Sequence, residues 1–515
     1  MQPQKPHALG GAPLRRRDFL AALGLGAAAM ATPAYAEGGS VSVAIPTASP
    51  EASRRPNIIC ILADDMGYGD VRALHPASKI PTPHLDRLVG EGMNFTDAHS
   101  GSAVCTPTRY GLLTGRYCWR SRLKRGVLMG FDRALIEDGR PTVASLLRDG
   151  GYATACLGKW HLGMDFPTTD GKPANPKNVD WTGRIKRSPL ANGFDHYYGI
   201  SASLDMPPYI WIDGDRFVGK ATATKAFFRK GPAEPAFEAV DVLPELGRRA
   251  VSYIEGRAKE KAPFFLYLPL NAPHTPIVPA KPFQGKSGIG SYGDFCVQVD
   301  AIVGDICAAL ERTGLAKDTL LIFTTDNGCS PAAGTPKLEK LGHFPSAGRR
   351  GYKADVFEGG HRVPFIARWP RRVAPGSSYG QTVCLTDLLA TCADIVGIPV
   401  PDNAGEDSVS LRPALLGETQ APVREATVHH SIDGSFAIRK GKWKLEECPG
   451  SGGWSAPKPK SKAEKGLPPI QLYDMAADPA ETTNVWDKHP DVVKELSALL
   501  KRYKEEGRSV PKRTK

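Results

Sequence analysis

The feature that most constrains the fold of this chain is a set of four apolar segments that each end in polar residues. The segments span residues 57–63, 152–157, 264–268 and 320–325. Helical patterns precede the last three, at residues 142–148, 244–258 and 295–312. Because each segment is apolar almost throughout, it is typical of a strand buried on both faces of a parallel sheet. We therefore predict an α/β protein with a large, mostly parallel sheet sandwiched by helices.

The polar residues that follow these segments have side chains suited to metal binding and acid–base chemistry. In chain order they are Asp64, Asp65, Lys159, His161, His274, Asp326 and Asn327. The carboxyl ends of parallel strands meet at one edge of a sheet, where α/β proteins bind their ligands. We expect these side chains to form a single site at that edge.

The C-terminal part of the chain has a different pattern. Residues 436–439 and 442–445 flank Lys440-Gly441 as a hairpin, and residues 471–474 form a further short strand. A loop rich in Pro, Lys, Gly and Ser spans 449–468, and an amphipathic helix is expected over about 491–506. We predict a linker at 37–55, a catalytic domain at 56–434 and a smaller C-terminal α+β subdomain at 435–515, with an antiparallel sheet packed against the terminal helix.

The first 36 residues have the pattern of an export signal. Arg16-Arg17 and Phe19-Leu20 match a twin-arginine signal, an apolar run follows to Ala31, and Ala34-Tyr35-Ala36 is a small-x-small cleavage site. The run is shorter than the roughly 20 residues that a membrane-spanning helix needs, so cleavage is favoured over a permanent anchor. We expect a bacterial protein that is exported to the periplasm or secreted, without stable membrane insertion.

The charge of the chain bears on its binding partners, and its cysteines bear on disulfide bonds. The chain has 66 basic and 54 acidic residues, and removal of the leader, with its four basic residues and one acidic residue, leaves a net charge of +9. This excess favours anionic partners, but the basic residues form no long run typical of nucleic-acid binding, so we expect no nucleic-acid partner. The ten cysteines lack framework spacing, and we expect mostly buried free thiols. The pattern leaves the oligomeric state open.

One cysteine stands at a predicted helix start. Thr106 is a good N-cap, Pro107 a good first helical residue, and Gly115 a good helix end. Cys105 would then lie at the positive end of the helix dipole with Arg109 one turn along, a place that lowers a thiol pKa and receives anions. A buried structural cysteine before an ordinary capped helix is the alternative.

These motifs together resemble those of a known family. They are Asp64-Asp65-Met66-Gly67-Tyr68-Gly69-Asp70, Cys105-Thr106-Pro107-Thr108-Arg109, Gly158-Lys159-Trp160-His161, Pro273-His274, Asp326-Asn327-Gly328, and Lys353 ahead of Glu358-Gly359-Gly360. The set resembles the formylglycine-dependent type I sulfatases, the arylsulfatase and carbohydrate-sulfatase group of the alkaline phosphatase superfamily. The resemblance covers nearly all of the chain after residue 55. Its most specific element is Cys-x-Pro-x-Arg followed by Leu-Thr-Gly-Arg.

The resemblance implies a modified residue 105. In that family a formylglycine-generating enzyme oxidises the cysteine of this motif to an aldehyde, and the hydrated aldehyde offers two hydroxyls on one carbon. One hydroxyl attacks sulfur and displaces the alcohol, and the second then loses its proton and expels sulfate. Cys105 would therefore supply a formylglycine nucleophile, not a thiolate.

The resemblance also implies one metal ion, held by Asp64, Asp65, Asp326, Asn327 and residue 105. Oxygen ligands of this kind suit Ca²⁺ or Mg²⁺ better than Zn²⁺, and the family favours Ca²⁺. Taken singly, Asp64-Asp65 could be capping carboxylates and Asp326-Asn327-Gly328 a plain turn.

Further roles follow from the same family. Arg109 and Lys159 would hold residue 105 and the sulfate, and His161 would accept a proton when sulfate is expelled. His274 and Lys353 would face the bridging ester oxygen, where one of them acts as general acid. Lys159, His274 and Lys353 would thus also bind substrate. We favour His274 as the acid because an imidazolium releases its proton readily near neutral pH.

The sequence thus indicates a sulfuric ester hydrolase that acts on sulfated sugars or glycan fragments. A phosphoester or phosphonate hydrolase of the same superfamily is one alternative, and a non-catalytic protein that binds sulfated glycans is another. Long loops at about 164–192 and 201–238 are expected to shape the opening of the site. Their aromatic residues, of a type that stacks on sugar rings, are Trp181, Tyr209, Trp211 and Phe217.

Overall fold

The computed structural model describes residues 55–513, which form one compact unit. The predicted leader and all but the last residue of the predicted linker lie outside the described residues. Among the described residues, no helix is long and apolar enough to cross a membrane.

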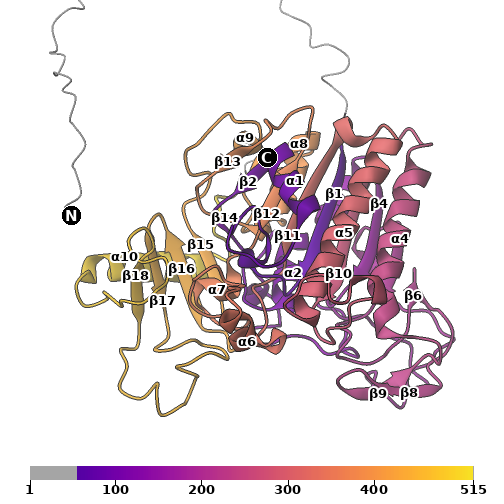
Figure 1. Cartoon of the computed structure of the whole chain (residues 1–515), viewed down its shortest axis with the longest axis horizontal. Coiled ribbons are helices and arrows are strands. Elements are labelled where there is room, and N and C mark those ends of the chain that lie inside the picture. The colour runs from indigo at the N-terminus through magenta and orange to yellow at the C-terminus, as the bar shows by residue number, and fades with distance from the viewer. Residues whose placement is uncertain (1–54, 514–515) are drawn as a thin grey trace, which may run out of the picture. The chain divides into compact units, whose positions relative to one another are not determined.

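A ten-stranded sheet forms the centre of the molecule (Figure 1). Its strand order is β13-β2-β12-β11-β1-β10-β4-β5-β6-β7. The five central strands run parallel, and they are β11 (Thr319–Thr325), β1 (Asn57–Asp64), β10 (Phe264–Pro273), β4 (Ala153–Lys159) and β5 (His196–Ile200). Antiparallel pairs occur towards both edges, which hold β12 (Phe365–Arg368), β2 (Met93–Phe95), β13 (Ser377–Tyr379), β6 (Ile212–Asp213) and β7 (Arg216–Phe217).

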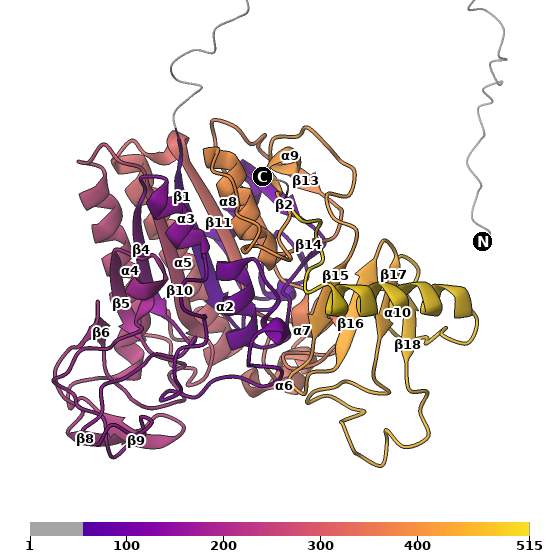
Figure 2. The ribbon, with the colours of Figure 1, turned by 180° about the vertical axis from the view of Figure 1, so that it is seen from behind.

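Helices cover both faces of this sheet, as Figures 1 and 2 show from opposite sides. One face packs against α1 (Pro83–Glu91), α4 (Ala239–Arg257) and α5 (Ser291–Arg312), and the other against α2 (Cys105–Thr114), α3 (Val143–Asp149) and α8 (Leu388–Val396). Successive residues of β1 alternate between the two cores: Ile59 and Ile61 join the first, and Ile58 and Leu62 the second. All eight residues of β1 are buried, which explains its continuous apolar run. The predicted layered α/β architecture is confirmed.

One predicted helix begins earlier than the sequence pattern indicated. The start was expected at Pro244, whereas α4 begins at Ala239 and contains Pro244 in its second turn. Proline has no backbone N–H, so the helix loses one hydrogen bond at Pro244. The buried face formed by Val242, Leu246 and Ala250 nevertheless runs without interruption past this position. Burial of that face outweighs the one missing hydrogen bond.

The C-terminal region forms a four-stranded antiparallel sheet in the order β15-β16-β17-β18. Its strands are β15 (Thr427–His430), β16 (Phe436–Lys440), β17 (Trp443–Glu446) and β18 (Gln471–Asp474), and α10 (Pro490–Glu505) packs against it (Figure 2). The hairpin, the short strand and the terminal helix were predicted. Strand β15 was not, and it begins before residue 435, where the subdomain was expected to start.

The antiparallel sheet shares its core with the segment that follows α2. Tyr117 and Trp119 pack in one buried cluster with Val428, Ile438 and Leu500. The sheet therefore rests on the part of the main domain that carries the Cys105 motif.

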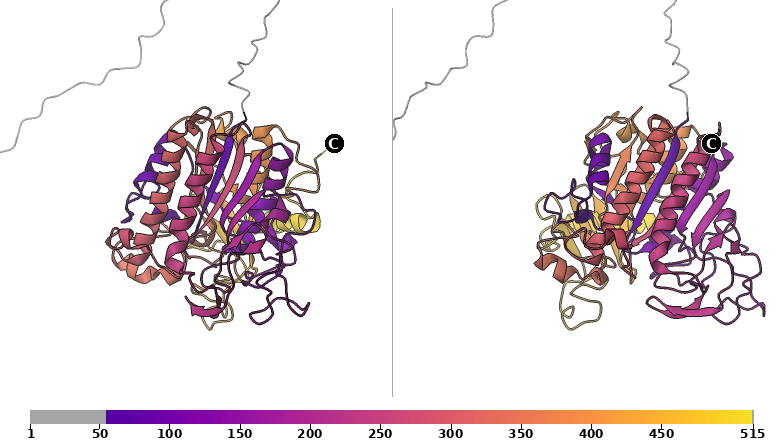
Figure 3. Two further views of the ribbon diagram at one scale, coloured as in Figure 1. Left: turned by 90° about the vertical axis from the view of Figure 1, so that its right-hand side faces the viewer. Right: turned by 45° about the vertical axis from the view of Figure 1, so that its right-hand side comes forward.

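Shorter elements complete the chain. They are β3 (Ala98–His99), β8 (Ala223–Ala226), β9 (Lys230–Ala233), α6 (Thr335–Lys340), α7 (Glu358–His361), β14 (Val383–Cys384) and α9 (Arg412–Leu415). Long connecting segments gather at the end of the sheet where the parallel strands finish (Figure 3).

Candidate active site

The parallel strands bring the predicted polar residues to one edge of the sheet. Asp64 and Lys159 are the last residues of β1 and β4, while His274 and Asp326 directly follow β10 and β11. All four side chains are buried. The expectation that strand ends would gather these residues is confirmed by the ion pairs that join them.

Asp64 and Asp326 lie at the centre of these ion pairs. Lys159 Nζ is 2.5 Å from Asp64 Oδ2, and Arg109 Nη2 is 2.8 Å from Asp326 Oδ2 and 3.6 Å from Asp64 Oδ2. Burial disfavours the charge of Asp64, yet Lys159 and His274 hold its pKa below the usual range. Burial and the neighbouring charge of Asp64 raise the pKa of Asp326 to about 7. This crowding of carboxylates is typical of a site that accommodates a cation.

Asp65 binds a second group of side chains. Lys353 Nζ lies 2.6 Å from Asp65 Oδ1, Asn327 Nδ2 donates to Asp65 Oδ1 over 2.7 Å, and His274 Nε2 lies 3.6 Å from Asp65 Oδ2. Asp65 has a left-handed backbone with φ of +67°. A non-glycine residue with such a backbone carries strain, and strain of this kind clusters at functional sites.

Cys105 lies next to the first carboxylate group. Its Sγ and one carboxylate oxygen each of Asp64 and Asp326 lie within 4.8 Å of one another. The helix starts at Cys105 itself with Val104 as N-cap, so the prediction of Thr106 as N-cap is wrong. Thr106 Oγ1 instead accepts a hydrogen bond from the backbone of Leu128. Gly115 ends the helix as predicted.

The thiol of Cys105 is not activated. Burial raises its pKa, and the nearby Lys159 and Lys353 offset only part of that effect. The expectation of a lowered thiol pKa is therefore wrong, because only 2% of this residue is exposed. An unmodified Cys105 would be a poor nucleophile.

His161 presents a free ring nitrogen to the interior. Its Nε2–H donates to the carbonyl oxygen of Leu128 over 2.8 Å, which leaves Nδ1 as the acceptor. Nδ1 is buried and has no hydrogen-bond partner among the described residues. Burial, Lys159 and Arg109 lower the pKa of His161 well below its usual value, so the ring is neutral and able to accept a proton.

The donor set fits a hard divalent cation. Asp64 Oδ1 and Asn327 Oδ1 are buried oxygens without a hydrogen-bond partner in the described part of the chain. Asp65 and Asp326 supply further carboxylate oxygens at the same strand ends. Orphaned buried oxygens are costly unless a cation or donor binds them, and this all-oxygen set suits Ca²⁺ or Mg²⁺.

Ser203 was missed in the sequence, and Asp205 was given no role there. Ser203 Oγ accepts a hydrogen bond from Lys159 Nζ over 2.7 Å and lies 3.4 Å from His274 Nδ1. Asp205 pairs with Arg229 through one oxygen, while its buried Oδ1 has no partner within the described residues. Both follow β5, a fifth parallel strand whose five residues are too few for a clear apolar run.

The aromatic residues expected at the opening are mostly part of the core. Tyr209 and Phe217 are buried, Trp181 packs on Phe217, and Trp211 stacks on Tyr198. The idea that these rings stack on sugars finds no support in the structure.

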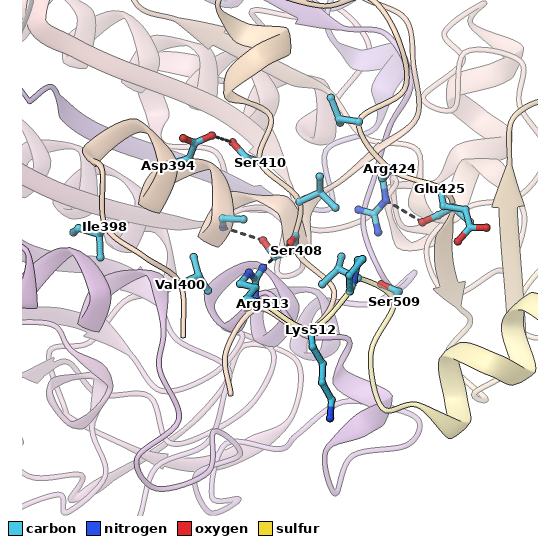
Figure 4. A pocket seen from close by; sticks show the side chains of 16 residues that line it. Asp394, Ile398, Val400, Ser408, Ser410, Arg424, Glu425, Ser509, Lys512 and Arg513 are labelled. Atoms are coloured by element: carbon cyan, nitrogen blue, oxygen red, sulfur yellow. Dashed lines mark hydrogen bonds between the residues drawn. The ribbon is translucent and has the colours of Figure 1, made fainter. Parts of the chain in front are cut away.

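A separate pocket of about 690 Å³ lies away from these strand ends (Figure 4). It is lined by α8 residues such as Asp394, by Arg424 and by the C-terminal residues Ser509 to Arg513. None of the predicted site residues lines it, so we do not assign the chemistry to it.

The chain is similar to proteins of a known family over most of its length. The model of the Sulfatase family matches residues 56–398. N-acetylgalactosamine-6-O-sulfatase of Bacteroides thetaiotaomicron is 35% identical over 88% of this chain and 94% of its own length. Human arylsulfatase A is 33% identical, with 87% of each chain covered.

The fold also matches solved structures. A structure from work on the metabolism of multiple glycosaminoglycans by Bacteroides thetaiotaomicron superposes with a TM-score of 0.78 at 33% identity. The match covers 88% of this chain and 100% of the other. The likeness therefore extends beyond single motifs to nearly the whole described chain.

Proposed function

The chain belongs to the Sulfatase family and is a sulfatase, and from this premise we propose that it hydrolyses sulfate esters of sulfated sugars after export from the cytoplasm. The observation that carries the proposal is the meeting of Cys105 with Asp64 and Asp326 at the strand ends. Lys159, His161, His274 and Lys353 are buried around this group. The names of the carbohydrate sulfatases that the chain resembles support sugar sulfates as the substrate class.

Residue 105 would act as formylglycine, made from Cys105 by a formylglycine-generating enzyme. One hydroxyl of the hydrated aldehyde loses its proton to water and its oxygen attacks sulfur, the bond from sulfur to the sugar oxygen breaks, and an acid protonates that oxygen. The second hydroxyl then gives its proton to a base, its oxygen forms the C=O bond, and the bond from carbon to the sulfate oxygen breaks. His161 is placed to be that base, since its buried Nδ1 is a free acceptor.

Asp64, Asp65, Asp326 and Asn327 would hold one divalent ion, Ca²⁺ in preference to Mg²⁺. When bound, the ion supplies Lewis acidity towards sulfate and residue 105. Its charge would also satisfy the orphaned Asp64 Oδ1 and Asn327 Oδ1. Arg109 and Lys159 orient the carboxylates through their ion pairs and keep positive charge beside the sulfate.

His274 and Lys353 would face the sugar oxygen that leaves. His274 Nδ1 lies 2.7 Å from the carbonyl oxygen of Thr275 and donates to it, so Nε2 is directed towards Asp65 and the site. Burial and Lys353 lower the pKa of His274, and a bound sulfate ester, as an anion, would oppose this shift. Lys353 keeps its charge because Asp65 raises its pKa against the effect of burial. We assign the acid to His274 and charge stabilisation to Lys353.

The experiment that tests this function is a hydrolysis panel. Protein produced with a formylglycine-generating enzyme is assayed for sulfate release from defined sulfated monosaccharides, beginning with N-acetylgalactosamine 6-sulfate, and from their phosphate analogues. We expect turnover of at least one sugar sulfate and much slower turnover of the phosphates. Efficient cleavage of aryl sulfates or phosphates with no sugar sulfate cleaved would contradict the proposal.

A further inference from the structure

Two of the exposed aromatic residues lie on loops near the candidate active site. Phe228 and Trp454 have 69% and 44% of their surface exposed, in a chain whose other aromatic residues are mostly buried. Phe228 lies at the turn between β8 and β9, and Trp454 in the loop between β17 and β18. Both loops extend beyond the edge where the parallel strands end (Figures 1 and 2).

Each aromatic residue is linked to the catalytic group through a short chain of contacts. Phe228 is followed by Arg229, which pairs with Asp205, and Asp205 is two residues from Ser203, the neighbour of Lys159 and His274. The link to Trp454 runs through the other side of the site. Its backbone N–H donates to Asp355 Oδ1 over 2.8 Å, and Asp355 is two residues from Lys353.

His274 and Lys353 are the two groups proposed to face the departing sugar oxygen. The loop that carries Phe228 therefore adjoins the His274 side, and the loop that carries Trp454 adjoins the Lys353 side. A sugar joined to the sulfated unit on this side would then extend towards these loops. This part of the argument rests on the proposed function.

Both loops are strongly basic. Residues 218–233 contain no acidic residue and expose Lys220, Arg229 and Lys230. Residues 449–468 contain one acidic residue, Glu464, and four exposed lysines, which are Lys458, Lys460, Lys462 and Lys465. Within residues 55–513, these four lysines make no salt bridge. A surface with exposed cations beside flat apolar rings complements a chain of sulfated sugars, which is polyanionic and has apolar ring faces.

We infer that the β8–β9 hairpin and the β17–β18 loop bind the sugars next to the cleaved sulfate, so that the natural substrate is a sulfated oligosaccharide chain and not a lone sulfated sugar. Trp454 and Phe228 contact ring faces, and the loop lysines neutralise sulfates on neighbouring units. Attraction of this kind weakens as salt screens the charges.

The test compares a monosaccharide with a chain on matched variants. The loop variant is Lys458→Ser with Lys462→Ser and Lys465→Ser, and the control is Lys259→Ser with Lys261→Ser and Lys317→Ser, three exposed lysines near the opposite ends of the strands. The two substrates are N-acetylgalactosamine 6-sulfate and a tetrasaccharide that carries a sulfate on each repeating disaccharide. Each variant is assayed on both in about 20 and about 200 mM NaCl. Trp454→Ala and Phe228→Ala are assayed alongside.

We expect the loop variant to lose roughly tenfold in kcat/KM on the tetrasaccharide at low salt and to keep its monosaccharide activity. Trp454→Ala and Phe228→Ala should also lose activity on the tetrasaccharide alone, and the control should match the parent. Equal losses on both substrates, or a loop variant that behaves as the control, would overturn the inference.

A binding measurement separates this inference from the proposed function. Calorimetric titration of the tetrasaccharide into Cys105→Ala protein needs no turnover, and the loop substitutions should weaken binding there by a similar factor. Unchanged tetrasaccharide binding would refute the loop assignment even if sugar sulfates are hydrolysed. Weakened binding without any sugar sulfate hydrolysis would support the loops and refute the function.

Discussion

Ser203 Oγ lies 2.7 Å from Lys159 Nζ, and it connects the loop after β5 to the lysine at the end of β4. The same lysine is 2.5 Å from Asp64, so Ser203 supplies the second contact that fixes the ammonium group. A cation proposed to hold sulfate is thus oriented by a hydroxyl from a neighbouring strand end.

Ser203→Ala should weaken this orientation without changing the fold. Loss of a hydrogen bond to a charged group costs roughly 1.5–3 kcal/mol, so kcat/KM should fall about ten- to hundredfold. Ser201→Ala is the control, because Ser201 is also buried and its Oγ makes only a 3.5 Å contact with the carbonyl oxygen of Gly130. Steady-state kinetics showing the same loss in both variants would assign the effect to packing.

Asp326→Asn should weaken binding of the divalent ion while keeping an oxygen in place. Because one negative charge is removed from the oxygen ligands, the affinity of the site for calcium should fall by at least about tenfold. Calcium titration with elemental analysis measures this, and Asp300→Asn, a buried aspartate on α5, serves as control. Stoichiometric zinc in the purified protein would count against the assignment of a hard cation.

His274→Ala should be selective for the leaving group. A sugar alkoxide needs a proton as it departs and an aryl oxide does not, so we expect a loss of about 10²–10⁴ in kcat on sugar sulfates and a much smaller loss on 4-nitrophenyl sulfate. Lys353→Met, measured in parallel, should slow both substrates. If His274→Ala slows both equally and Lys353→Met is selective, the acid is Lys353.

Stability should decline as the pH falls below neutrality, with His430 as one contributor. Burial lowers the pKa of His430 to about 4, against 6.5 in the unfolded chain. The unfolded state binds a proton first, so folding stability is full above pH 6.5 and decreases as the pH falls to about 4, by up to about 3 kcal/mol from this group.

The check is denaturant unfolding of the parent and His430→Gln between neutral pH and mild acid. The variant should show a smaller pH slope than the parent, by about one proton. A parental slope in His430→Gln would show that His430 takes up no proton on unfolding.

The sequence was most informative at the ends of long buried strands. Asp64, Lys159, His274 and Asp326 could be placed at one edge because parallel strands of an α/β sheet share their direction, so a motif's position along the chain determines its position in space. The short strand β5 has no such pattern, so Ser203 was missed and Asp205 was given no role.

Side-chain exposure could not be predicted in the same way. Tyr209 and Phe217 lie in long loops, where aromatic residues were expected to be accessible, yet both are buried. Among residues 55–513, Phe228, from the same region, is the large apolar residue with the highest exposed fraction. The exposure of a side chain depends on which segments pack over it, and the composition of the surrounding sequence does not predict that packing.

The burial of Cys105 bears on when the proposed oxidation of its thiol could occur. Every residue of α2 is buried, and the segment before it is held by Ala103, whose N–H donates to the carbonyl oxygen of His430 over 3.0 Å. An oxidising enzyme cannot reach the thiol once β15 has closed over this segment. The proposed oxidation would therefore precede folding, and with a twin-arginine leader, which carries proteins already folded, both events would finish in the cytoplasm.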